Sequence, residues 1–291
     1  MTIDHYENFP VASWLCPPAL RPAVAAIYHF ARTADDIADE GDTPASERLA
    51  LLAEYGLALT LAAAGGDTGG RWQHVFEPLA AVIARHRIPL SPLTDLLSAF
   101  AQDTGNPIYP DRAGLLDYCA RSANPIGRLL LHLAGVTDRE ALAQSDDVCT
   151  ALQLINFWQD LSIDLPRGRV YVPVGDAARV GLDVRQLRAG TDSAPSRALV
   201  RSLVRWARDT MLTGAPLVHR LPGRMGWELR FVVQGGLRVL DKIENGGHNT
   251  LSHRPTVGRA DLPRLAWRAL RMSRPLRTVT GMPLPTDERR S

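Results

Sequence analysis

The stretch that decides the fold is QLINFWQDLSID, residues 153–164, in which polar side chains recur at four-residue steps. Asn156, Asp160 and Asp164 share one face of a helix, because residues four apart lie one turn above another. Most of the remaining side chains are large and apolar, which is typical of a buried helix. A buried carboxylate is costly unless a metal ion, an arginine or a proton neutralises it. The stretch predicts a helical core with a polar site inside it.

A second acidic stretch, DDIADE at residues 35–40, closely follows the apolar run AAIYHFA. Asp35 and Asp39 are four residues apart and share a helix face, whereas Asp36 points about 100° away. Like charges on one face repel by roughly a few tenths of a kcal/mol per pair, so the clustering needs a reason. Taken alone, the stretch fits either a solvated helix end or a site where a cation neutralises the charge.

Two helices that each offer a carboxylate pair, packed face to face, would form a site for a hard cation. Magnesium suits such a site, because it takes one or two carboxylates and completes its shell with water and phosphate oxygens. Zinc would need histidine or cysteine ligands, which neither stretch offers. A buried aspartate–arginine network, with Arg32 or Arg169 as partners, is the alternative that the residues leave open.

Apolar residues recur at three- and four-residue spacing along most of the chain, which predicts helices. The predicted ranges are 23–37, 47–62, 72–86, 93–101, 115–133, 140–163, 197–212 and 225–244. The one strand-like piece, RVYVPV at 169–174, is short and isolated, so we expect no sheet. We expect an all-α domain over residues 1–280 and a frayed tail over 281–291.

The composition excludes several classes of protein. Among the 291 residues, 45% are apolar and 22% charged, as in ordinary globular proteins, and the net charge of +2 argues against a nucleic-acid partner. Cys16, Cys119 and Cys149 form neither a zinc pattern nor a disulfide framework, which favours a reducing compartment. The sequence shows no signal-peptide pattern and no apolar run long enough to cross a bilayer. We expect a cytoplasmic protein.

The two acidic stretches in their context resemble one family. AIYHFARTADDIADE at 26–40 and LINFWQDLSIDLPRGRVYVP at 154–173 are similar to the motifs of the squalene and phytoene synthases, all-α enzymes that use prenyl diphosphates. The resemblance covers residues 9–258. The shorter stretches most resemble the hydroxysqualene-forming members of bacterial hopanoid biosynthesis. These stretches are ENFPVAS (7–13), ANPIGRLLL (123–131), NFWQD (156–160) and VVQGGLRVLDKIE (232–244).

The resemblance implies an isoprenoid-synthase-type helical bundle around a central cavity, with two to three magnesium ions that bind a diphosphate. The implied catalytic, metal-binding carboxylates are Asp35, Asp39, Asp160 and Asp164, joined by Asn156 as a further metal ligand. The implied substrate-binding residues are Arg32, Tyr28, Tyr118, Gln153, Arg169 and Tyr171. Structural roles remain open, since the tyrosines could be core aromatics and Arg169 could cap a helix.

The implied reaction is ionisation of presqualene diphosphate, rearrangement of the cation and capture by water, which yields hydroxysqualene without NADPH. We expect Asn124 to hold that water, because Pro125 can open the helix and free polar groups there. The chain departs from the family at Gln159, where many relatives have arginine, and at Asn8, where relatives often have serine. Two alternatives stay open. One is condensation of two prenyl diphosphates to presqualene diphosphate, dehydrosqualene or phytoene, and the other is a non-catalytic homologue that binds partners.

The segment 262–274 predicts a basic amphipathic helix. Its apolar side would carry Leu262, Leu265, Ala266, Ala269 and Leu270, and its basic side Arg264, Arg268, Arg271 and Arg274, with Trp267 near the boundary. Such a helix can lie on an anionic membrane surface or pack on its own protein. Peripheral contact with the inner membrane face and contact with other hopanoid-pathway enzymes are therefore further expectations.

Overall fold

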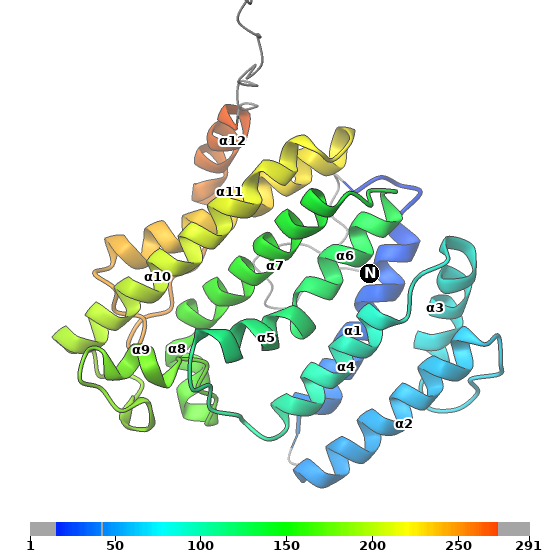
Figure 1. The fold of residues 1–291 in the computed structure, drawn as a ribbon, viewed down its shortest axis with the longest axis horizontal. Coiled ribbons are helices and arrows are strands. Elements are labelled where there is room, and N and C mark those ends of the chain that lie inside the picture. Colours follow the sequence, from blue (N-terminus) through cyan, green and yellow to red (C-terminus); the bar gives the residue numbers. More distant parts are fainter. Residues whose placement is uncertain (1–15, 42, 273–291) are drawn as a thin grey trace, which may run out of the picture.

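The computed structural model describes residues 16–41 and 43–272, and these form helices and short 3₁₀ turns without any strand (Figure 1). The α-helices are α1 (Arg21–Asp39), α2 (Ala45–Ala63), α3 (Gln73–His86), α4 (Ser91–Asp103), α5 (Arg112–Ser122), α6 (Asn124–Leu133), α7 (Arg139–Gln159), α8 (Leu161–Asp164), α9 (Val174–Ala178), α10 (Ala194–Gly214), α11 (Gly223–Asn245) and α12 (Leu262–Arg271). The 3₁₀ turns span Leu165–Arg167, Val184–Gln186, Ala215–His219 and Arg259–Asp261. The predicted all-α class is confirmed.

Helix α7 lies at the centre of the bundle and packs against α5, α6, α10 and α11 (Figure 1). Leu154, Ile155 and Trp158 are buried on it, as the sequence predicts for a helix that is apolar on most sides. Gly214 lets α10 approach closely, since a Cβ there would lie 2.6 Å from the Gln144 carbonyl oxygen. The first part of the stretch QLINFWQDLSID, residues 153–159, thus lies on a helix that is surrounded by four others.

A second layer covers the other side of α1. Helices α1, α2, α3 and α4 share an apolar cluster in which Phe30, Tyr55 and Phe76 pack ring against ring. The Tyr55 hydroxyl donates a hydrogen bond to the Phe30 carbonyl oxygen at 3.1 Å, so this buried phenol has a polar partner. The cluster fixes the orientation of α1, which carries the first acidic stretch.

Two predicted helices are each split in the structure. The range 115–133 breaks between α5 and α6, because Pro125 has no N–H to donate to the preceding turn and therefore starts a new helix. The range 140–163 breaks at Asp160, where the amide of Ser162 donates to the carbonyl oxygen of Thr250 at 3.1 Å. Asp160 therefore lies at a bend between α7 and α8 instead of within one straight helix.

No helix in the described ranges is long and apolar enough to cross a membrane. The predicted tail at 281–291 and the stretch ENFPVAS lie outside the described residues, so the domain boundary at 280 stays a prediction.

Candidate active site

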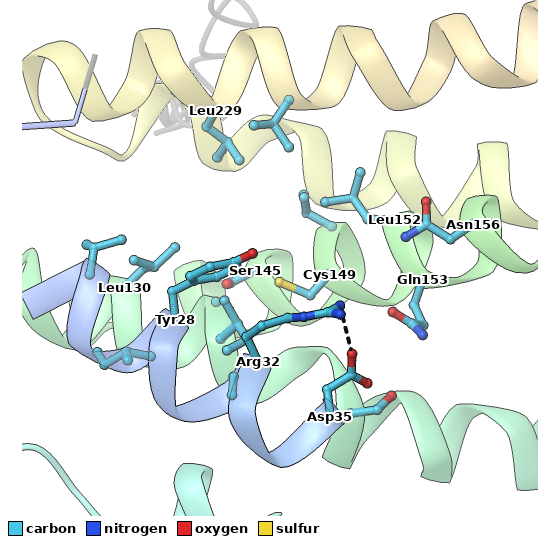
Figure 2. A pocket seen from close by; sticks show the side chains of 18 of the residues that line it. Tyr28, Arg32, Asp35, Leu130, Ser145, Cys149, Leu152, Gln153, Asn156 and Leu229 are labelled. Carbon is cyan, nitrogen blue, oxygen red and sulfur yellow. Dashed lines mark hydrogen bonds and ion pairs between the residues drawn. The ribbon is translucent and has the colours of Figure 1, made fainter. Parts of the chain in front are cut away.

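A cavity of about 680 Å³ runs between α1, α6, α7 and α11. One end is polar and the other is lined by apolar side chains such as Leu20, Leu130 and Leu229. Figure 2 shows Tyr28 and Arg32 reaching into it from α1, with Gln153 and Asn156 on the facing helix α7. The volume falls within the range that holds a small organic ligand.

The structure brings nearly all of the sequence-predicted site residues to this cavity. Those that line it are Tyr28, Arg32, Asp35, Asp39, Tyr118, Gln153, Asn156, Asp160, Asp164, Arg169 and Tyr171. Helix α1 supplies the first carboxylate pair because the spacing of four puts both on one face. The α7–α8 bend supplies the second pair from the opposite wall.

Two other residues lie away from the cavity. Asn124 is buried, and its side-chain oxygen accepts a hydrogen bond from the Thr150 hydroxyl at 2.9 Å, which joins α6 to α7. The helix does break before Pro125, as predicted, but the side-chain amide of Asn124 packs against α7 and does not line the cavity. Gln159 is also buried, and its amide donates to the Pro255 carbonyl oxygen at 2.7 Å. Asn8 lies outside the described residues.

Arginines pair with the carboxylates at the polar end. Arg32 lies 3.2 Å from Asp35 and 2.6 Å from Asp36, and Arg169 forms an ion pair with Asp39. The aspartate–arginine network that the sequence left open is therefore present, with both expected arginines in it. Arginine side chains of this kind bind the oxygens of carboxylates and of phosphates through the same planar set of donors.

Arg254 is a third arginine that the sequence analysis missed. Its Nε lies 2.5 Å from Oδ1 of Asp160 and its Nη2 lies 3.1 Å from Oδ2, a two-point ion pair. The two residues are 94 positions apart in the sequence. No local pattern marks Arg254, because it sits in a loop whose position depends on the packed bundle.

Asp103 is a carboxylate that belongs to neither acidic stretch, yet it also lines the cavity. Its Oδ2 accepts a hydrogen bond from the Tyr118 hydroxyl at 2.6 Å, whereas Oδ1 is buried without a hydrogen-bond partner. Burial raises its pKa to about 7, and the nearby Asp35 adds to that effect. Asp164 has its pKa raised to about 7 as well, first by burial and then by the charge of Asp160. Both groups therefore favour a proton or a cation at neutral pH.

An aromatic wall stands beside the carboxylates. The ring of Tyr171 stacks on Phe157 with centroids 3.8 Å apart, and Tyr118 lies 5.9 Å from Tyr171. Burial is the main reason that the pKa of both tyrosines is raised, so their hydroxyls stay neutral. Such ring faces can stabilise a positive charge without reacting with it.

Helices α6 and α7 approach closely beside the cavity because of Gly127. A Cβ at this position would lie 2.4 Å from Oγ of Ser145 and 2.6 Å from Sγ of Cys149. Ser145 and Cys149 both line the cavity, where they add polar groups between apolar neighbours (Figure 2). Burial raises the pKa of the Cys149 thiol to about 12, so it remains a neutral thiol.

The donor set at the polar end consists of carboxylate and amide oxygens, which are the ligands of magnesium. Within the described residues, no three histidine, cysteine, aspartate or glutamate side chains converge on one metal position. An ion at this end would therefore take one or two carboxylates and need water or phosphate oxygens to complete its shell. Magnesium binds in that manner, so the residues fit this metal together with a diphosphate better than they fit the metal alone.

A helical bundle with a long, mostly apolar cavity and oxygen ligands at one end defines a class of enzymes that handle an anionic group on a hydrocarbon. The model of the squalene/phytoene synthases matches this chain over residues 3–262. The chain belongs to the squalene/phytoene synthase family, which makes it a prenyltransferase-type enzyme for prenyl diphosphate substrates.

Individual relatives agree with the family. The chain is 34% identical to a hydroxysqualene synthase from Sinorhizobium fredii over 238 residues, which cover 81% of this chain and 78% of that protein. It is 32% identical to a phytoene synthase from Thermus thermophilus over 252 residues, 86% of this chain and 83% of that protein. Its fold is similar to the crystal structure of squalene synthase HpnC from Alicyclobacillus acidocaldarius. That match has a TM-score of 0.76 and 35% identity, covering 84% of this chain and 90% of that one.

Proposed function

We propose that this enzyme ionises presqualene diphosphate and lets water capture the rearranged cation, forming hydroxysqualene and free diphosphate. The observation that carries the proposal is the cavity, which places carboxylates from α1 and from the α7–α8 bend at one end of a long apolar space. We expect the diphosphate to occupy the polar end and the C30 hydrocarbon to occupy the apolar remainder of the cavity. The similarity to a hydroxysqualene synthase over most of the chain supports this particular reaction.

The first step is loss of the diphosphate. Magnesium would be held by Asp35, Asp39, Asn156, Asp160 and Asp164, and it would supply Lewis-acid stabilisation of the leaving group. Arg32 and Arg169 would bind the phosphate oxygens through their planar donor forks, and Gln153 would donate a further hydrogen bond. Arg32 lies on α1, Gln153 on α7 and Arg169 in the loop before α9, so the diphosphate would be held from several sides while the carbon–oxygen bond breaks.

The second step is rearrangement of the cyclopropylcarbinyl cation. Tyr171, Phe157 and Tyr118 would face the positive charge with their rings, which attract a cation but offer no strong nucleophile. Bulk water must stay out during this step, because it would trap the cation before it rearranges. The apolar lining of the cavity serves that purpose.

The third step is capture by one water molecule. The water oxygen would form the new carbon–oxygen bond, and the proton it loses would pass to the released diphosphate. Ser145 and Cys149 are polar groups that face the cavity, so they replace Asn124 as the candidates for holding this water. The reaction consumes no reductant, so NADPH is not expected to be a cofactor.

Under this proposal the enzyme is a carbon–oxygen lyase of hopanoid biosynthesis. It would act in the cytoplasm, beside the enzymes that supply presqualene diphosphate and consume the alcohol.

A second candidate is condensation of two prenyl diphosphates. The 32% identity to a phytoene synthase favours it, because that relative is matched over a similar share of the chain. A reductive reaction is a variant of this candidate, since the similar crystal structure is that of a protein described as a squalene synthase. A non-catalytic homologue is disfavoured, because all four expected carboxylates are retained at the cavity.

Product analysis separates these candidates. Purified enzyme with magnesium would receive presqualene diphosphate or farnesyl diphosphate, each with and without NADPH, in water enriched in oxygen-18. Mass spectrometry should detect a labelled C30 alcohol from presqualene diphosphate without NADPH. A hydrocarbon that needs NADPH, a product from farnesyl diphosphate alone, or an unlabelled alcohol would contradict the proposal.

A further inference from the structure

Helix α12 presents large apolar side chains to solvent. It packs on α11 through Leu265 and Ala269, which are buried, whereas Leu262, Trp267 and Leu270 are 54%, 57% and 63% exposed. Leu262 and Leu270 belong to the predicted apolar side of the helix, together with Leu265 and Ala269. Only Leu265 and Ala269 are buried against α11, so the contact with α11 covers part of the predicted apolar side and leaves Leu262 and Leu270 exposed.

The exposed side of α12 combines apolar and basic groups. Pro263, Trp267 and Leu270 follow one another at spacings of four and three, so they form a stripe along the helix. Arg264 and Arg271 lie beside this stripe, and the Arg271 guanidinium stands 4.5 Å from the centre of the Trp267 ring. Long arginine side chains can cover apolar surface in this way while their charges remain in water.

The charge of this surface is not neutralised locally. The sequence of α12, LPRLAWRALR, contains three arginines and no acidic residue. Arg268 is occupied by Asp241 at 2.6 Å. Arg264 and Arg271 are exposed, and within ranges 16–41 and 43–272 neither has a carboxylate partner. Two positive charges are therefore available to an anionic partner.

The same surface continues onto α11. Trp227 is 41% exposed, and the Arg230 guanidinium lies 4.8 Å from the centre of its ring. Arg230 also donates to the carbonyl oxygen of Ala269 at 3.0 Å, which ties Trp227 to α12. We call Trp227, Arg264, Trp267, Leu270 and Arg271 the Trp–Arg patch. Figure 1 shows α12 at the edge of the molecule, on the side away from α2 and α3.

Helix α11 stands between the patch and the cavity. Met225, Glu228 and Leu229 line the cavity, and they flank Trp227 in the same turns of α11. Met225 and Leu229 are each two residues from Trp227, so they point about 160° away from it on the helix. One face of α11 therefore lines the cavity, and roughly the opposite face carries Trp227.

We propose that the Trp–Arg patch docks on an anionic lipid surface, with α12 lying in the plane of the headgroups. Tryptophan is the residue that prefers the membrane–water interface, and exposed arginines bind anionic headgroups. Helix α12 has an apolar stripe beside a basic one and is only two to three turns long. Such a helix can insert shallowly into the headgroup region of a membrane but is too short to cross it. This docking does not depend on which product the enzyme makes.

Vesicle co-sedimentation of the full chain tests this proposal without any activity measurement. The probes are vesicles of pure phosphatidylcholine and vesicles that also contain phosphatidylglycerol, at low and at high salt. We expect binding only to the anionic vesicles, with a clear loss at high salt because exposed charges are screened. Equal binding to both lipids, or no binding to either, overturns the proposal.

Variants locate the contact. Trp267→Ser with Leu270→Ser should reduce the bound fraction at least about tenfold, since it removes the inserted groups. Arg264→Gln with Arg271→Gln should weaken binding about fivefold for each charge. Leu57→Ser on α2 is the matched control, because Leu57 is also an exposed leucine on a helix surface but lies far from the patch. All of these side chains are exposed, so the variants should fold.

Two results would assign the patch to a different role. If the double variant binds anionic vesicles as well as the parent protein, the patch is not the lipid contact. If sedimentation shows a dimer that the double variant breaks, and vesicles do not bind, then the patch joins two copies of this chain. Either result overturns docking on lipid.

Discussion

Arg254 holds Asp160 by two contacts, of 2.5 Å and 3.1 Å, at the bend where α7 gives way to α8. Both side chains are mostly shielded from solvent, so the pair keeps a carboxylate neutralised at a position where a metal ion is expected. A buried charge that loses its partner destabilises the fold. Arg254 therefore supplies the positive charge that neutralises Asp160.

Replacing Arg254 tests whether its guanidinium and a magnesium ion compete for Asp160. Arg254→Ala should lower the free energy of unfolding by about 1–3 kcal/mol in the absence of metal, because Asp160 is left without its partner. Magnesium should then raise the melting temperature more in the variant than in the parent. Arg128→Ala, which breaks an exposed pair with Asp146, is the control and should change little. An equal magnesium response in parent and variant would contradict the role of Arg254.

The carboxylates of α1 are expected to serve the metal and not the fold. Asp35→Asn should lower turnover roughly 100-fold or more, equivalent to about 3 kcal/mol, while circular dichroism and melting stay close to the parent. Asp160→Asn should also abolish turnover, but it will cost stability too because it leaves Arg254 unpaired. Asp117→Asn, on an exposed carboxylate of α5, is the control. Diphosphate release measures the outcome, and full activity of Asp35→Asn would exclude a metal role.

Asp103 should make stability depend on pH. Its pKa is about 7 in the folded protein, against about 3.9 in an unfolded chain, so between these values the folded state binds more protons. Stability contributed by this group is therefore lost as pH rises from about 4 to about 7. Asp103→Asn should raise the melting temperature at pH 8 by a few degrees and leave it unchanged at pH 4, in the presence of a chelator. The same increase at both pH values would show that the ionisation of Asp103 is not the cause.

Gly127 should control the distance between α6 and α7. Gly127→Ala forces a methyl group against Ser145 and Cys149, so it should destabilise by about 1–3 kcal/mol and lower turnover by reshaping the cavity. Adding Ser145→Ala and Cys149→Ala should restore much of the stability. Gly114→Ala is the matched control, because the nearest atom to its new Cβ lies at 3.5 Å. Calorimetry that finds no loss in Gly127→Ala would show that the helices can separate freely.

Magnesium and a diphosphate analogue should stabilise the protein cooperatively. No three-ligand metal position exists in the described residues, so magnesium needs the phosphate oxygens to complete its coordination shell. The diphosphate in turn needs magnesium to neutralise its charge, so each ligand should strengthen the binding of the other. The melting temperature should therefore rise far more with both than the sum of the separate shifts. Strictly additive shifts in differential scanning fluorimetry would show that the two ligands do not share a site.

The sequence was sufficient to predict the helical class and most of the polar side chains that line the cavity. The reason is local, since Asp35 and Asp39 lie on one turn of helix and Asn156 lies on the same face as the following aspartates. Periodicity within one segment determines which side chains share a face, and that rule holds whatever the segment packs against. Tyr28 and Tyr171 were placed only by resemblance to the family.

What the sequence missed depends on contacts between distant segments. Arg254 and Asp103 reach the site from a loop and from a helix end that no motif marks. The position of Asn124 could not be predicted for the same reason. Its side-chain amide bonds to Thr150 on α7, and this contact depends on how α6 packs against α7. The bend at Asp160 also arises from a remote partner, the carbonyl of Thr250.

Helix α7 packs against α5, α6, α10 and α11 and also carries Gln153 and Asn156, so two of the residues proposed to bind the metal and the substrate lie on a helix with little freedom to open locally. Backbone amides in such a position exchange with solvent only when the whole domain opens. On heating, the enzyme should thus lose substrate binding and tertiary structure in one transition. We expect no partly unfolded state that still forms the reactive cation but lets bulk water reach it.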